Sequence, residues 1–332
     1  PLPGAGAAQP MKTERAHALH PSSHRWWLRG WHSAALCLAG LALPGCTSQP
    51  LQPYSTQGTP LMLVPALQQP QQDRRARFRE IFCAVLEARK QALPDYRACD
   101  EALVAFGETP AGSGAAVNLG PARLPLRLVF VPGVGWDCVA PWLAMEQSIP
   151  AHLRTLGYDM LRVGISGLAD SRVNAARIRD AILALPANRG AADLVLVGYS
   201  KGATDVLQAL ASHPELVPRL AAVVSLAGSV GGSPLANDAS DNTLELMQLF
   251  PGATCERAGQ GPLPDLKPLT RQAWLAHNPL PPAIPYYSLV TLPAPERISA
   301  ILQASYRKLS LVDARNDGQL IFYDQFIPCL LY

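Results

Sequence analysis

A serine flanked by two glycines follows an apolar run in the segment Leu194–Gly202, which reads LVLVGYSKG. A serine hydroxyl becomes a nucleophile once a base removes its proton. The apolar run favours a buried strand and the residues after Ser200 favour a helix, so Gly198 and Gly202 would give a sharp turn the room that it needs. The first N–H groups of that helix would point at the same place. We therefore predict that Ser200 is a nucleophile; the alternative is a serine in a structural turn.

A serine nucleophile needs a base, and histidine is a common one. Of the seven histidines, only His213 and His277 follow Ser200. His213 would stand at the far end of the helix that begins at Ser200, about 20 Å away at about 1.5 Å of rise per residue. His277 lies in an irregular region and would have to swing inward. The sequence therefore supplies no evident base, and His277 stays an alternative.

Strand-like and helix-like segments alternate through the rest of the chain, and they must position these groups. Apolar runs predict strands at residues 123–132, 158–165, 193–197, 219–226 and 285–292. Helical spacing of apolar residues predicts helices at residues 75–92, 144–157, 169–185, 201–212 and 295–309. Continuous apolar strands between helices predict an α/β fold with a mostly parallel sheet and helices on both faces.

Residues 229–283 break this alternation. They are rich in Pro, Gly and Asn, and a structureless connection of this length is usually functional. We expect a lid-like insertion over the sheet edge where ligands bind. Its apolar side chains suit either an acyl-chain pocket or simple packing: Leu244, Leu246, Met247, Leu249 and Phe250.

The net charge limits the possible partners. A formal charge of +3 over 332 residues is small, and the chain has no block of Lys and Arg of the kind that tracks phosphates. We therefore expect no nucleic-acid partner. Residues 72–332 are long enough for one folded domain, in which residues 72–107 predict an N-terminal helical hairpin.

The first 46 residues are typical of a targeting segment. Basic residues precede an apolar run at residues 33–45 that is too short to span a bilayer, which needs about 20 residues. The run ends in Leu43-Pro-Gly-Cys46, which resembles a bacterial lipobox. That resemblance implies a lipid on Cys46 and anchoring at the periplasmic side of a membrane; a cleaved signal peptide or a short buried helix are the alternatives. Residues 47–71, rich in Pro and Gln, predict a flexible tether.

The remaining cysteines bear on the compartment. Disulfides persist in exported proteins, and Cys83 and Cys99 flank a predicted helix–turn–helix that a bridge between them would staple. The alternative is two buried thiols. No CxxC pair and no cluster of His and Cys is present, so we expect neither a metal nor another cofactor.

The strand–serine–helix arrangement resembles the α/β-hydrolase fold, in particular the bacterial lipases and esterases, from about Pro125 to the end of the chain. The resemblance implies an acyl-enzyme on Ser200, formed from a small-molecule or lipid acyl substrate, with an oxyanion hole made by two backbone N–H groups. One would belong to Lys201, whose side chain we expect to be solvated. The other would belong to Val134, in a turn after an earlier strand. The acid would be Asp317, because Asn-Asp-Gly resembles the segment that carries it; Glu296, Asp313 and Asp324 are the alternatives.

The same family places its histidine after the acid, beyond one more strand. Residues 318–332 contain no histidine, so we expect the fold to be incomplete at its C-terminal end and the hydrolase to be impaired. Truncation, a frame shift or a natural pseudoenzyme would each explain this. The competing interpretations are a non-catalytic binding or structural lipoprotein on a hydrolase scaffold, and an acyltransferase that uses the same serine.

Overall fold

The structure is a computed structural model that describes residues 72–93, 96–103, 111–122, 124–140, 145–187, 192–249 and 251–328. The predicted leader (1–46) with Cys46 and the predicted tether (47–71) lie outside these residues. Within the described ranges, no helix combines the length and the apolar character that a membrane span requires.

The centre of the domain is a five-stranded sheet in the order β2-β1-β4-β5-β7, and every pairing in it is parallel. Its strands are β1 (Arg127–Val131), β2 (Asp159–Arg162), β4 (Leu194–Tyr199), β5 (Leu220–Leu226) and β7 (Tyr286–Leu289). Each overlaps a predicted strand. These pairings confirm the predicted parallel sheet. Its strands are continuous apolar runs because both faces of such a sheet are covered.

The carboxyl ends of four neighbouring strands lie at one edge of the sheet. Val131 pairs with Gly198, Gly198 with Ser225, and Ser225 with Ser288. Residues that follow β1, β4, β5 and β7 therefore meet at this edge. Ligands of open parallel sheets bind at such an edge.

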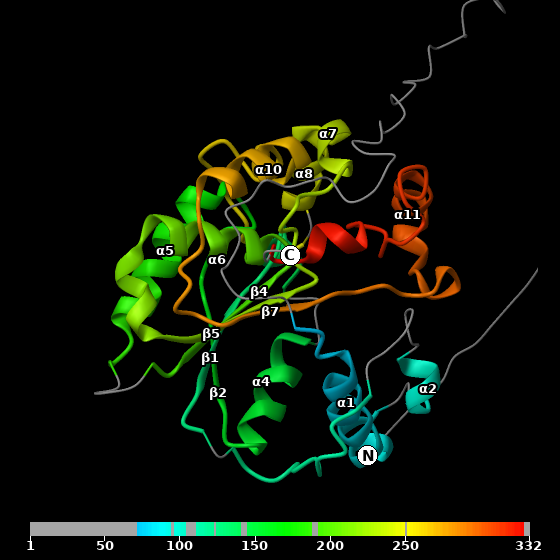
Figure 1. The fold of residues 1–332 in the computed structure, drawn as a ribbon. Coiled ribbons are helices and arrows are strands. Elements are labelled where there is room, and N and C mark those ends of the chain that lie inside the picture. Colours follow the sequence, from blue (N-terminus) through cyan, green and yellow to red (C-terminus); the bar gives the residue numbers. More distant parts are fainter. Residues whose placement is uncertain are drawn as a thin grey trace, which may run out of the picture. The chain divides into compact units, whose positions relative to one another are not determined.

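Helices cover both faces of the sheet. Figure 1 shows α4 (Met145–Thr155) on one side and α5 (Ser171–Ala184) with α6 (Lys201–Ser212) on the other. The side chains of Ile178 and Ile182 in α5 and of Val206 and Leu210 in α6 are buried in the main core. Burial of these apolar stripes holds α5 and α6 against each other and against the strands.

The N-terminal hairpin consists of α1 (Arg75–Arg89), a 3₁₀ turn η1 (Lys90–Ala92) and the short α2 (Cys99–Ala102). A disulfide joins Cys83 in α1 to Cys99 in α2. The apolar side chains of α1 are not fully buried, and Phe78 and Ile81 are exposed at 36% and 41%.

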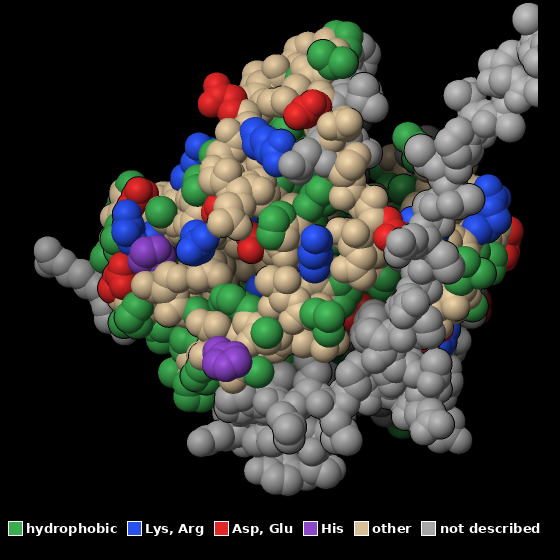
Figure 2. All heavy atoms as spheres, turned by 90° about the horizontal axis from the view of Figure 1, so that it is seen from above, with side chains coloured by type: hydrophobic (Ala, Val, Ile, Leu, Met, Phe, Trp, Pro, Cys, Tyr) green, Lys and Arg blue, Asp and Glu red, His purple; other side chains and the backbone are tan. Residues whose placement is uncertain are grey.

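Residues 229–283 are more regular than expected. They contain α7 (Leu235–Asp238), α8 (Asp241–Gln248), α9 (Leu263–Leu266), α10 (Pro268–His277) and β6 (Arg257–Ala258), which pairs in parallel with β3 (Leu168–Ala169). The expectation of lost order is wrong, since proline is compatible with the first turn of a helix and Pro268 opens α10. Figure 2 views the molecule from above and shows acidic and basic side chains interspersed on that side, with apolar ones in separate groups.

The segment after β7 differs from the single helix predicted at residues 295–309. It forms two 3₁₀ turns, η4 (Pro295–Arg297) and η5 (Ala300–Leu302), followed by α11 (Gln303–Leu309). Ile298 and Ser299 between the turns have extended ψ angles of 125° and 147°, and Ile298 is buried. A further 3₁₀ turn, η6 (Phe322–Gln325), follows the Asn-Asp-Gly segment.

Candidate active site

Ser200 forms a strained turn between β4 and α6. Its φ of 52° and ψ of −124° are unusual for a residue with a side chain and cost on the order of 1–3 kcal/mol. Gly198 and Gly202 make the turn possible: a Cβ on Gly198 would lie 2.5 Å from the Cα of Ala203, and one on Gly202 would lie 2.1 Å from the Val131 carbonyl oxygen. The two glycines therefore leave the room for a sharp turn that the sequence pattern predicted.

Backbone hydrogen bonds hold this turn in place. The Ser200 N–H donates to the Leu226 carbonyl at the end of β5, and the Ser200 carbonyl accepts from the N–H groups of Ala203 and Ser229, each at 3.1 Å. The turn is thus fixed to its own helix and to the loop after β5. Such fixation is what keeps a strained nucleophile turn from relaxing.

The turn after β1 touches Ser200. A Cβ placed on Gly133 would lie 2.8 Å from the Ser200 Cβ and 3.3 Å from its Oγ. Val134 follows directly, and its N–H donates to no acceptor within the part of the chain that the structure describes. Lys201 is the first residue of α6, so its N–H has no intrahelical acceptor. The structure thus brings the turn that contains Val134 next to Ser200 and Lys201.

Asp317 has hydrogen-bond donors on both carboxylate oxygens. Its Oδ2 accepts from the Thr291 hydroxyl at 2.6 Å and from the Gln325 amide at 3.4 Å. Its Oδ1 accepts from the N–H groups of Gln319 and Leu320 at 2.8 and 2.7 Å. Four donors fix the orientation of this carboxylate.

Asp317 and Ser200 belong to the same edge of the sheet. Thr291 follows β7 and Ser200 follows β4, with β5 between them, so two strand spacings of about 4.8 Å separate the strand ends. The pKa of Tyr199, next to Ser200, is raised by burial and by the negative charge of Asp317. Asp317 therefore lies near the carboxyl ends of β4 and β7.

The alternative acids have other surroundings. Asp313 forms an ion pair with Arg315 at 2.6 Å, and Glu296 is exposed in η4. Asp324 is buried in η6, where its backbone carbonyl accepts from the Gly231 N–H at 2.7 Å.

The ring nitrogens of the two later histidines contact groups other than Ser200. His213 follows the last residue of α6, and its Nδ1 lies 3.5 Å from the Glu215 carboxylate. His277 ends α10, and its Nδ1 lies 2.7 Å from the Ala273 carbonyl. Among the described residues, no histidine hydrogen-bonds to Ser200 or Asp317.

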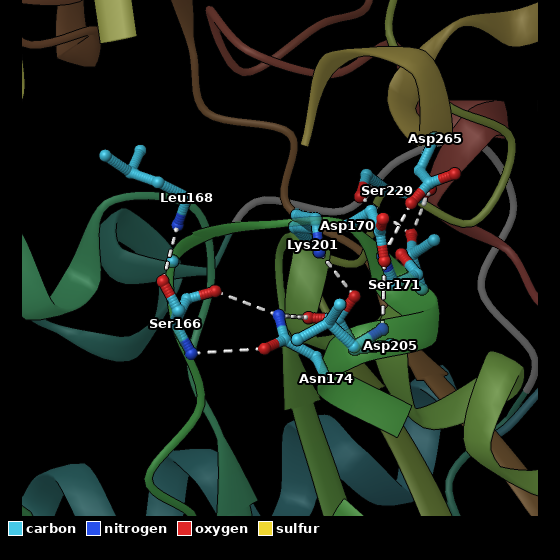
Figure 3. A network of polar contacts seen from close by, with 12 residues as sticks. Ser166, Leu168, Asp170, Ser171, Asn174, Lys201, Asp205, Ser229 and Asp265 are labelled. Atoms are coloured by element: carbon cyan, nitrogen blue, oxygen red, sulfur yellow. Dashed lines mark hydrogen bonds and ion pairs between the residues drawn. The ribbon is translucent and has the colours of Figure 1, made fainter. Parts of the chain in front are cut away.

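The expectation of a solvated Lys201 side chain is wrong. It is 1% exposed, and its ammonium lies 2.5 Å from Oδ1 of Asp205, which is fully buried one turn further along α6. Figure 3 shows this pair beneath the start of α6, beside polar side chains of α5. Burial raises the pKa of the Asp205 carboxyl, and the charge of Lys201 opposes that rise. A buried charge requires such a partner.

A second disulfide, which the sequence did not predict, ties the β1 turn to the lid-like segment. It joins Cys138 in α3 (Trp136–Val139) to Cys255, 117 residues later. Met247 of α8 packs nearby, because a Cβ on Gly135 would lie 2.8 Å from the Met247 methyl group. Of the proposed pocket residues, Leu244 is buried in this cluster and Leu249 is 76% exposed. Phe250 and the side chain of Leu246 lie outside the described residues.

Within the described part of the chain, one group of side chains has the composition of a metal site, and it contains this disulfide. Asp137, Cys138 and Cys255 bring three potential ligand atoms within 4.8 Å of one another. Both sulfurs are already bonded to each other, and a metal requires thiolates. The group therefore does not form a metal site in this state.

A parallel sheet, a strained serine between strand and helix, and a turn against that serine together define an α/β-hydrolase. Among solved structures, the metagenomic carboxyl esterase MGS0156 is 38% identical, with a TM-score of 0.71 over 81% of this chain and 81% of that chain. This chain therefore belongs to the α/β-hydrolase family, with a carboxyl esterase as a relative. The mature lipase BlEst2 of Bacillus licheniformis is 20% identical, with a TM-score of 0.48 over 63% of this chain and 82% of that chain. No model of a protein family and no curated protein sequence matches.

Proposed function

We propose that this chain is a serine hydrolase that cleaves carboxylic esters or thioesters through an acyl-enzyme on Ser200. The observation that carries the proposal is the strained φ of 52° at Ser200 with Gly133 in contact beside it. Family membership supports ester hydrolysis in general, and the structural relative MGS0156 is a carboxyl esterase.

Each neighbouring group would have a defined task. The Ser200 oxygen attacks the carbonyl carbon while a base takes its proton, and the carbonyl oxygen becomes an oxyanion. The N–H groups of Lys201 and Val134 donate to that oxyanion; losing one such donor typically costs about 3 kcal/mol of transition-state stabilisation. The alcohol or thiol leaves with the proton, and water then releases the acid by the same steps in reverse. Asp317 would orient the base.

The described part of the chain places no histidine as a base beside Ser200. His213 and His277 are engaged elsewhere, so neither is placed to take the proton of Ser200. We therefore propose that this chain turns over esters slowly. The same observation favours the second candidate, a non-catalytic binding protein on a hydrolase scaffold.

Added imidazole separates these possibilities, because a neutral imidazole can accept the serine proton in place of a histidine. Hydrolysis of p-nitrophenyl acetate is measured with and without imidazole, and the rate of Ser200→Ala under the same conditions is subtracted. Imidazole-dependent turnover that requires Ser200 is the expected result. Fast Ser200-dependent turnover without imidazole would contradict the impaired base. No Ser200-dependent rate under either condition, together with no labelling of Ser200 by a fluorophosphonate, would favour the scaffold protein.

We further propose that the protein is an exported lipoprotein, anchored through Cys46 at the periplasmic side of a bacterial membrane. The two disulfides of the described domain support an oxidising compartment. The test is Cys46→Ala followed by cell fractionation. Release from the membrane fraction is expected, and unchanged partitioning at the same processed size would overturn the anchor.

A further inference from the structure

Three buried polar side chains form a chain of contacts beneath the nucleophile turn. The Lys201 ammonium pairs with Oδ1 of Asp205, and Oδ2 of Asp205 accepts from the Asn174 amide at 2.8 Å. The exposed fractions are 1% for Lys201 and 0% for Asp205 and Asn174. Figure 3 shows that Asn174 comes from α5 and reaches the α6 pair from the side.

Asn174 extends this network to the loop before β3. Its Oδ1 accepts from the Ser166 N–H at 3.1 Å, and its Nδ2 donates to the Ser166 carbonyl at 2.9 Å. One side chain thus satisfies both backbone groups of a buried loop residue. Because buried polar groups are costly without partners, this arrangement is strongly preferred over any that breaks one of the bonds.

The loop held by Asn174 in turn holds the turn after β1. The Gly167 carbonyl accepts from the Gly135 N–H at 3.2 Å, and the Gly167 N–H donates to the Asp137 carboxylate at 3.0 Å. A Cβ on Gly167 would lie 2.4 Å from the Gly135 nitrogen, so the two backbones are in direct contact. Gly135 follows Val134, the second proposed oxyanion donor. The contacts therefore run from the first turn of α6 to the turn after β1.

We propose that Lys201, Asp205 and Asn174 are positioning residues that hold the two oxyanion-hole N–H groups at a fixed separation. The inference rests on the proposed function, since it concerns the donors of that reaction. The three side chains face the α5–α6 interface and act through the backbone of Lys201 and through the Ser166–Gly167 loop. Oxyanion donors stabilise a transition state only within a narrow distance range of about 2.7–3.1 Å, so a small displacement of either donor lowers the rate.

The decisive variant is Asn174→Leu, which keeps the branched shape and the number of heavy atoms of the side chain and removes the hydrogen bonds that Asn174 makes to Asp205 and Ser166. Asn174→Ser is the milder second variant in case the first folds poorly. Ile178→Ala is the matched control, because Ile178 is fully buried on the same helix within the apolar core. Its side chain makes no hydrogen bond, so the substitution destabilises α5 and removes none of the hydrogen bonds of the network.

Two measurements are made on the full chain. The first is hydrogen–deuterium exchange of the Gly135 amide, which is protected by its bond to Gly167; we expect it to exchange at least about tenfold faster in the Asn174 variants than in Ile178→Ala of similar melting temperature. The second is imidazole-supported hydrolysis of p-nitrophenyl acetate, with the Ser200→Ala rate subtracted. We expect kcat to fall at least about tenfold while KM changes little, as for an interaction made only in the transition state.

Exchange and kcat that match the Ile178→Ala control would overturn the proposal and leave the network a purely structural role. Faster exchange at Gly135 with unchanged kcat would also overturn it, because the donors would then not depend on the network. If the wild-type chain has no Ser200-dependent turnover at all, the proposed function fails. In that case faster exchange at Gly135 would show that the Asn174 network stabilises the turn after β1 but has no catalytic role.

Discussion

Substitution of Gly133 by alanine tests the contact between the β1 turn and Ser200. The added Cβ would lie 2.8 Å from the Ser200 Cβ and 3.1 Å from the Tyr199 carbonyl oxygen. An ordinary contact begins at 3.4 Å, so the turn must move by about 0.6 Å, and misplacement on the order of 1 Å can cost about 10²-fold in rate. We expect kcat/KM to fall about 10²-fold, which corresponds to about 2.7 kcal/mol.

The assay is imidazole-supported hydrolysis of p-nitrophenyl acetate, corrected with Ser200→Ala. Overpacking also costs about 1–3 kcal/mol of folding free energy, so rates are compared below the melting transition of each variant. The control is Gly164→Ala: Gly164 has no positive φ, and a Cβ there would meet nothing within 4 Å. Its rate should equal that of the wild type. A Gly133→Ala enzyme with wild-type kcat/KM would refute the idea that this turn forms half of the oxyanion hole.

Three further changes test the packing around the site and the hairpin. Cys138→Ala with Cys255→Ala should lower the free energy of unfolding by about 4–5 kcal/mol, as a closed loop of roughly 100 residues implies; a loss below about 1 kcal/mol in urea denaturation would contradict this account. Lys201→Met should cost about 3–5 kcal/mol because it leaves the buried Asp205 carboxylate without an opposite charge, and the double variant with Asp205→Leu should regain most of it; strictly additive losses would argue against the pair. Hydrogen bonds from Arg77, from the Gly114 N–H and from the Ser113 hydroxyl lower the pKa of Glu80 to about 2 from 4.5, so the contribution of the Glu80 carboxylate to stability is complete above about pH 4.5 and is lost as the pH falls toward 2. The melting-temperature difference between wild type and Glu80→Gln should shrink over that interval, and a constant difference would be evidence against this ion pair.

The sheet and the nucleophile turn could be predicted because their determinants are local. The strand predicted at residues 193–197 corresponds to β4, and the helix predicted at residues 201–212 has the bounds of α6. A buried strand, two glycines and a helix start together require a sharp, strained turn at the serine between them. The Asn-Asp-Gly turn is partly local, since two of the four donors to Asp317, the N–H groups of Gln319 and Leu320, come from the next residues along the chain.

Structural features that depend on residues far apart in the chain could not be predicted in this way. The Cys138–Cys255 bond joins residues 117 apart, and no local pattern distinguishes it from other pairings of the same cysteines. The strands β3 and β6 contain two residues each, too few for any periodicity. The helices α7 and α9 contain four residues each, so Pro and Gly counts dominated the expectation for residues 229–283.

The burial of Lys201 is indicated by the spacing of residues along the helices rather than by their composition. Ile178 and Ile182 continue a helical stripe that begins at Asn174, and Ala209 continues one that begins at Lys201 and Asp205; every member is buried. Lysine is almost never buried unless it is paired, so a single lysine is reasonably assigned to solvent. Here, however, polar residues begin an otherwise apolar stripe on each of two helices. That pattern indicates polar groups that are buried and paired with each other. The start of α6 lies at the carboxyl edge of the five-stranded sheet, where ligands bind, and Asn174 in the first turn of α5 pairs with Asp205 beside it.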